Sequence, residues 1–106
     1  MNLHQTDPDF SERFEYFAFN EVPHEKAQQL DDITRYIVIL AALIGCGAQE
    51  AYKEIFEKAI SEGFSPIMAK EIVYQATDYL GYGKMLPFLN ITNEILIQNG
   101  VSLPLE

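Results

Sequence analysis

The sequence has few of the residues that several common classes of protein depend on. Lys and Arg together number 7, against 16 Asp and Glu in 106 residues, which gives a formal net charge of -9. Binding to nucleic acid or to an anionic membrane surface relies on contacts between Lys or Arg and phosphate groups. No basic stripe occurs along the chain. The sequence therefore predicts neither a nucleic-acid partner nor a membrane partner.

Long apolar runs, cysteine pairs and histidine pairs are also lacking. The longest apolar run, residues 36–44, is about half of the roughly 20 residues that a membrane span needs. No basic segment followed by an apolar stretch opens the chain, so no signal peptide is expected. Cys46 is single, which excludes an internal disulfide and favours a reducing cytoplasm. His4 and His24 are too far apart for a metal-binding pair, and we expect no metal and no other cofactor.

Helix signals follow one another with short gaps, and no segment shows sustained alternation of period two. Polar residues 20–29, which include Pro23, are expected to form a connection. We expect an all-α fold in one domain, residues 1–106 with a core of about 7–98. The expected helices begin at Asp7-Pro8, at Asp31 or Asp32, near Gln49, at Ser65-Pro66 and near Pro87.

The helix expected from Asp31 or Asp32 to about Ile44 is apolar almost all round. Such a helix must be covered on most of its sides. In a chain this short, the other helices cannot be relied on to cover it. A second copy of the chain is the simplest source of the missing surface, so we expect an oligomer.

Two later helices have periodic apolar faces, which predicts the side that each one buries. In the helix expected over residues 49–62, the polar face should carry Lys53, Glu54, Glu57, Lys58 and Glu62. Its buried face should carry Ala51, Tyr52, Ile55, Phe56, Ala59 and Ile60. In the helix that follows Ser65-Pro66 and stops at Gly81, the buried face should carry Ala69, Ile72, Val73, Ala76, Tyr79 and Leu80.

A resemblance to a known family rests on three consecutive segments: DPDFSERFEYFAFNEV (residues 7–22), LDDITRYIVILAALIGCG (30–47) and EAYKEIFEKAISEGFSPIMAKEIVYQATDYLGYGKM (50–85). They are similar to the aromatic entry helix, the Thr-Arg-Glu helix, and the Gly-x-Ser/Thr and Tyr-x-Gly helices of the carboxymuconolactone decarboxylase family, which includes alkylhydroperoxidase D-like proteins. The resemblance covers roughly residues 7–98. It implies a five-to-six-helix bundle that forms oligomers, often trimers or hexamers, and activities of lactone decarboxylation or peroxiredoxin-type hydroperoxide reduction.

The reactive positions of that family hold other residues in this chain. The glutamate that follows Thr-Arg in the family corresponds to Tyr36. The family histidine, four residues before the alanine of Ala-x3-Gly, corresponds to Ile55. The Cys-x-x-Cys pair of the peroxidase branch corresponds to Ala48 and Ala51, so the thiolate and the resolving thiol are both missing.

Five residues would line the family's pocket in this chain: Tyr36, Cys46, Ile55, Gln75 and Tyr79. Tyr36 is either a core residue with one satisfied hydroxyl or a proton donor. Cys46 is either a small buried residue in a Gly-Cys-Gly turn or a reactive thiol, although a helix C-terminus disfavours a thiolate. Gln75 either orients a bound carbonyl or satisfies a contact between helices. Ile55 cannot transfer a proton, which the family's chemistry requires near neutral pH.

The sequence leaves two main functions open. A remodelled enzyme would bind a small organic substrate in a largely apolar pocket on which polar groups converge. A non-catalytic oligomeric binding or scaffold protein would instead fill the space between Tyr36 and Ile55 by packing. The acidic charge supports a third hypothesis, an adaptor that recruits a basic partner.

Overall fold

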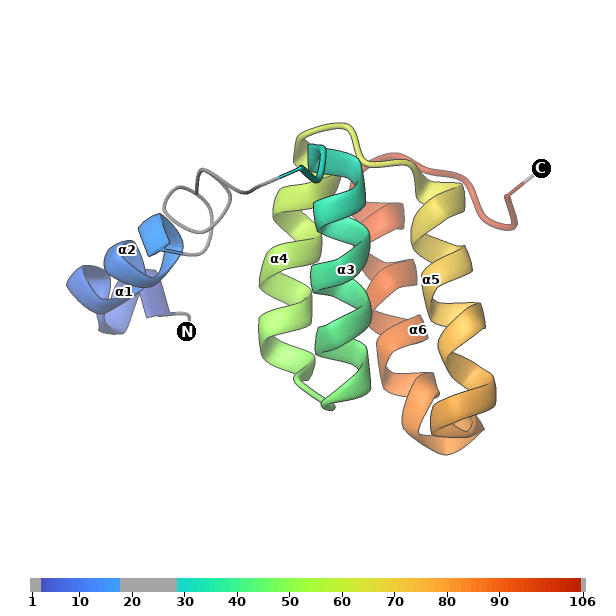
Figure 1. Ribbon diagram of the computed structural model, residues 1–106. Helices are drawn as coiled ribbons and strands as arrows, with labels where there is room; N and C mark the ends of the chain where they lie inside the picture. Colours follow the sequence, from blue (N-terminus) through green and yellow to red (C-terminus); the bar gives the residue numbers. More distant parts are fainter. Residues whose placement is uncertain (1–2, 18–28, 106) are drawn as a thin grey trace. The chain divides into compact units, whose positions relative to one another are not determined.

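The computed structural model describes residues 3–17 and 29–105. The chain divides into two compact units, Met1–Leu30 and Asp31–Glu106. All regular structure in the described ranges is helical, which confirms the all-α prediction (Figure 1). Most of the connection expected at residues 20–29, with Pro23 and His24, lies outside the described residues. The single domain expected over the whole chain stays a prediction.

None of the described helices is both long enough and apolar enough to cross a membrane.

The first unit contains a short helix, α1 (Leu3–Thr6), and a longer one, α2 (Pro8–Tyr16). Pro8 lies in the first turn of α2, where its missing N–H leaves no backbone bond unmade. Asp7 is the N-cap residue, as predicted, but its carboxylate accepts a hydrogen bond from Thr6 Oγ1 (2.8 Å) instead of from the helix backbone. The sequence did not predict α1, because one turn of helix leaves no periodic pattern.

Polar contacts join α1 to α2 within this unit. His4 Nδ1 lies 3.3 Å from the hydroxyl of buried Ser11, and His4 Nε2 lies 2.8 Å from Glu15 Oε1. The aromatic side chains that mark α2 in the sequence are more than half exposed; they are Phe10, Phe14, Tyr16 and Phe17.

The second unit is a bundle of four helices: α3 (Asp32–Gly45), α4 (Gln49–Ser61), α5 (Pro66–Leu80) and α6 (Tyr82–Gln98). Helix α3 packs against α4 and α5, and α6 packs against the same two helices. In Figure 1, α3 and α5 run in one direction, and α4 and α6 run back. The packed neighbours α3 and α5 are therefore parallel, and the connection between α4 and α5 crosses the end of the bundle.

Local sequence accounts for the ends of these helices. The carboxylate of Asp31 accepts a hydrogen bond from the Thr34 N–H (2.7 Å), and Ser65 Oγ accepts one from the Met68 N–H (3.3 Å). Both residues are N-caps that satisfy backbone donors of the first turn. Gly81 has φ +86, which ends α5 in a conformation that other residues rarely adopt. The predicted starts of α3, α4 and α5 are confirmed.

The predicted start of the last helix near Pro87 is wrong. Helix α6 begins at Tyr82, directly after Gly81, and contains Pro87 in its interior. A proline inside a helix lacks the N–H that would bond to the carbonyl four residues earlier, which here belongs to Gly83. Proline is favoured in the first turn of a helix and so predicts a start, but Pro87 is tolerated about a turn and a half into α6.

The apolar faces predicted for α4 and α5 form much of the core, with one exception. Tyr52, Phe56 and Ala59 are buried on α4, and the polar face predicted for that helix is exposed. On α5, Val73 is buried but Tyr79 is 92% exposed, so the prediction that Tyr79 faces the core is wrong. Tyr79 follows Val73 by six residues, which places it roughly 120° around the helix and away from the bundle.

A hydrogen-bonded chain crosses the buried centre of the bundle. Thr92 Oγ1 donates to the Phe88 carbonyl (2.7 Å), and this carbonyl can only accept. The Tyr52 hydroxyl, 2.5 Å from Thr92 Oγ1, is therefore the donor in the second bond. The Tyr52 ring also stacks on Phe56 and meets Phe88 edge to face. Among the described residues, every buried side-chain nitrogen or oxygen has a hydrogen-bond partner.

Candidate functional site

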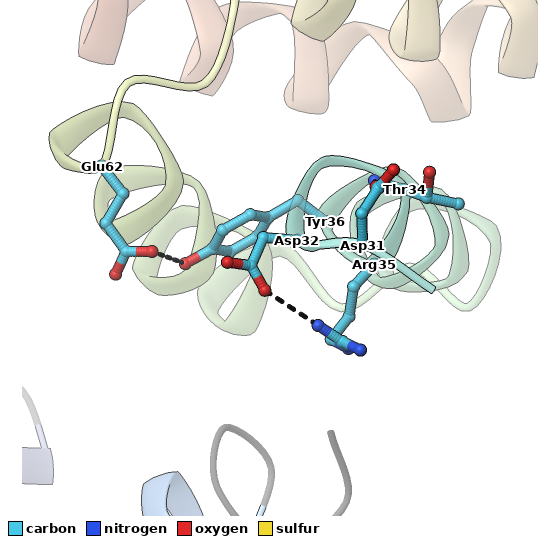
Figure 2. Close-up of polar contacts among 6 residues, drawn as sticks. All are labelled: Asp31, Asp32, Thr34, Arg35, Tyr36 and Glu62. Carbon is cyan, nitrogen blue, oxygen red and sulfur yellow. Dashed lines mark hydrogen bonds and ion pairs between the residues drawn. The ribbon is translucent and has the colours of Figure 1, made fainter. Parts of the chain in front are cut away.

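The first candidate residue from the sequence, Tyr36, is packed and hydrogen-bonded. Tyr36 lies in the second turn of α3, is 8% exposed, and meets Phe64 edge to face at 6.0 Å. Its hydroxyl donates to Glu62 Oε1 (2.8 Å), at the C-terminal end of α4 (Figure 2). The second oxygen, Glu62 Oε2, forms an ion pair with Lys58 Nζ (3.3 Å). Of the two roles considered for Tyr36, the structure confirms the core residue with one satisfied hydroxyl.

The first turn of α3 adds two more carboxylates beside this pair. Arg35 donates to Asp32 Oδ1 (2.9 Å), as Figure 2 shows. The backbone N–H and hydroxyl of Thr34 favour the charged form of Asp31 and hold the pKa of its carboxyl below its usual value. These contacts fix the start of the helix.

The environment of Tyr36 keeps its hydroxyl protonated. Burial raises the pKa of Tyr36 far above its usual value of 10.0, and the hydrogen bond to Glu62 raises it further. The negative charges of Glu62 and Asp32 add to this effect. A general acid needs a pKa near the working pH. Tyr36 is therefore a poor proton donor for a reaction at neutral pH. Its hydroxyl hydrogen already forms a hydrogen bond with Glu62.

The other four candidate residues do not gather around Tyr36. Ile55 is half-buried in the middle of α4, and Gln75 and Tyr79 are exposed on α5. Cys46 is the C-cap of α3, roughly 15 Å along the helix from Tyr36 at 1.5 Å per residue. The five side chains are thus spread over opposite ends and faces of the bundle.

The interpretation of Cys46 as a small buried residue is wrong. The side chain is exposed, and its thiol lies 3.6 Å from the Leu43 carbonyl one turn earlier. The turn after α3 lies at the end of the bundle, where no other helix covers it. The contact between helices considered for Gln75 is also absent, since that side chain is exposed.

Ala48 and Ala51, which correspond to the two thiol positions of the peroxidase branch in the resemblance, lie where α4 begins. Ala48 is the N-cap residue of α4, and Ala51 is half-buried in its first turn. Their methyl groups contribute no thiol and no polar atom. Among the five candidates and these two alanines, the structure brings together no nucleophile and base.

The sequence did not predict the partner of Tyr36. Glu62 is predicted on the polar face of α4, and its side chain is 49% exposed, yet it bonds to a side chain 26 residues earlier. No spacing rule links these two positions, because the contact depends on how α3 and α4 pack. The buried hydrogen bond between Tyr52 and Thr92 was likewise not predicted, since 40 residues separate the two side chains.

Comparison of the chain with family models, with curated proteins and with solved structures found no match. The resemblance to the carboxymuconolactone decarboxylase family therefore stays a prediction that rests on the three sequence segments.

Proposed function

We propose that this chain is a carboxymuconolactone decarboxylase-like helical domain that no longer carries the family's chemistry and acts as a non-catalytic, oligomeric binding or scaffold protein. The observation that carries the proposal is the hydrogen bond from Tyr36 to Glu62. The position of the family's glutamate holds a buried phenol whose proton is already donated to a carboxylate.

Two further observations support this proposal over a remodelled enzyme. Ile55, at the position of the family's histidine, has no proton to transfer. Gln75 and Tyr79 are exposed on the surface of α5, and Cys46 is exposed at the far end of α3 from Tyr36, whereas a substrate pocket needs polar groups that converge. Helix α3 begins within the second segment that resembles the family, α4 begins one residue before the third segment, and α5 begins within the third, in the expected order.

Turnover assays on the purified chain test the proposal. We expect no reduction of an organic hydroperoxide in the presence of a dithiol and no decarboxylation of a carboxymuconolactone, because loss of a proton-transfer group alone removes about 10²–10⁴ in rate. The matched variants are Cys46→Ser, which removes the only thiol, and Tyr36→Phe, which removes the buried hydroxyl. Turnover by the natural sequence that either variant abolishes would show that the chain is an enzyme.

A further inference from the structure

The outward side of α3 is apolar and has no covering helix within the bundle. Val38 is 53% exposed, and Ala41, Ala42 and Gly45 are exposed beside it. Tyr36, which contacts the end of α4, lies about 140° around the helix from Ala41. The exposed residues are therefore on the flank of α3 that turns away from α4.

The adjoining side of α5 continues this surface. Lys70 of α5 donates to Asn93 of α6 (2.6 Å), which identifies the flank of α5 that faces α6. Ile72 and Tyr79 lie roughly 200° and 180° around the helix from Lys70, on the opposite flank. Since α3 packs on α5, the two flanks meet in one surface, the α3–α5 face, made of Val38, Ala41, Ala42, Gly45, half-buried Ile72 and Tyr79, with the uncharged, exposed Gln75 one turn before Tyr79.

The charge and the size of the α3–α5 face indicate what covers it. None of its six residues is Asp, Glu, Lys or Arg, whereas the whole chain has a formal charge of -9. Two copies of an acidic chain repel each other least where neither carries charge. The 14 residues of α3 span about 21 Å. Two adjacent helices, each about 10 Å across with side chains, give the face a footprint on the order of 400 Å². This is the size of an apolar patch that marks an interaction site, and it suits the centre of an interface burying about 800 Å² per partner.

The shape of the α3–α5 face would allow two copies to fit together, with a projecting side chain of each copy against small residues of the other. Tyr79 projects from α5 and is 92% exposed, while Ala41, Ala42 and Gly45 leave a low surface on α3. Both helices begin at the same end of the bundle (Figure 1). Gly45 is the last residue of α3 and Tyr79 the last but one of α5, so the projection and the low surface lie at the same level.

We propose that two copies of this chain associate through the α3–α5 face about a two-fold axis parallel to the helices. This axis places α5 of each copy over α3 of the other, in the same direction, and sets Tyr79 against Ala41, Ala42 and Gly45 of the second copy. The inference rests on the proposed scaffold function, and the partner that it names is a second copy of this chain. A two-fold contact fits a dimer or a hexamer with two-fold axes, and it excludes a simple cyclic trimer.

Sedimentation velocity on the full chain at micromolar concentration tests whether two copies associate through the α3–α5 face. We expect the mass of a dimer or hexamer for the natural sequence. Tyr79→Glu and Ala41→Glu should each raise the dissociation constant roughly 30-fold or more, as for a hot-spot residue. The matched control is Tyr74→Glu, since Tyr74 is an exposed tyrosine of α5 on the flank that faces α6. Helical circular dichroism should be unchanged in all three variants, because each altered side chain is exposed.

Disulfide formation between two variants tests whether α5 of one copy lies over α3 of the other. In a Cys46→Ser background, Ala42→Cys and Tyr79→Cys are purified separately and then mixed under mild oxidation. The proposed axis predicts a disulfide-linked pair in the mixture and little in either variant alone. A monomeric or trimeric natural sequence, an unaltered mass in Tyr79→Glu, or equal cross-linking in the unmixed variants would each overturn the proposal.

The proposed non-catalytic function and the proposed contact through the α3–α5 face can be disproved independently. An assembled chain that turns over a substrate overturns the proposed function and leaves the contact standing. A monomeric chain without turnover overturns the contact alone.

Discussion

Buried hydroxyl groups determine how the central tyrosines respond to pH. Burial raises the pKa of Tyr52 to about 12. The phenol titrates near 10.0 when the chain is unfolded. The stability that comes from keeping Tyr52 neutral is therefore complete below about pH 10 and is lost as the pH rises toward 12.

Alkaline unfolding measures this effect. Between pH 9 and pH 11 we expect Tyr52 alone to lower the free energy of unfolding by about 1 kcal/mol. Tyr52→Phe should cost about 1 kcal/mol at pH 7, since Thr92 keeps its bond to the Phe88 carbonyl, but should weaken the pH dependence. Urea unfolding at both pH values checks this, with Tyr82→Phe as an exposed control. An equally steep pH dependence in Tyr52→Phe would contradict the prediction.

For single residues of the candidate site, the sequence predicted which side chains can react, but it did not predict where they lie. That Ile55 cannot transfer a proton, and that Ala48 and Ala51 supply no thiol, follows from residue type alone. The burial of Tyr36 and the exposure of Cys46 depend on which helices cover each position. A single sequence does not specify this for side chains near helix ends.

Helix ends are the features that the sequence specifies best at the scale of the element. Asp31 and Ser65 are both N-caps, and each accepts a backbone hydrogen bond that the first turn would otherwise leave unmade. They differ in one respect: Asp31 titrates and Ser65 does not.

A comparison of these two caps separates the effect of charge from that of the hydrogen bond. At pH 7, Asp31→Ala and Ser65→Ala should each lower the melting temperature by roughly a few degrees. The pKa of Asp31 is held below 3.8, so its contribution is present above that pH and is lost as the pH falls through the lowered value. Thermal unfolding from pH 7 to pH 3 should show the Asp31→Ala penalty shrinking while the Ser65→Ala penalty persists. Parallel losses in both variants at every pH would rule out this account.

The error at α6 shows where local signals stop being sufficient. Gly81 ends α5 and α6 starts at the next residue, so the turn between them has none of the polar residues that usually mark a loop. Pro87 is then tolerated within the helix. Because α6 packs along both α4 and α5, burial of its apolar side chains outweighs one missing backbone hydrogen bond.

At the scale of the whole molecule, the excess of acidic residues opposes association while the uncharged α3–α5 face favours it. With a net charge of -9, two copies repel each other over distances comparable to the Debye length. That length falls from about 30 Å at 0.01 M salt to about 10 Å at 0.1 M.

Self-association should therefore strengthen with added salt. We expect the dissociation constant to fall several-fold between about 0.02 M and 0.3 M sodium chloride, because repulsion is screened while apolar contact is not. Sedimentation equilibrium at the two concentrations measures the change. Weaker association at high salt would instead indicate that ion pairs hold the copies together.

The sequence by itself determined the helical class, the ends of α3, α4 and α5, the buried face of α4 and the lack of reactive side chains at positions 36, 48, 51 and 55. These follow from local periodicity, capping and residue type, which act within a few turns of helix. Only the tertiary structure decided that Tyr36 bonds to Glu62, that Tyr79 faces outward, and that the uncovered flank of α3 continues onto α5. Each of these depends on contacts between helices far apart in the chain, and the angle at which two helices pack is set by their combined surfaces.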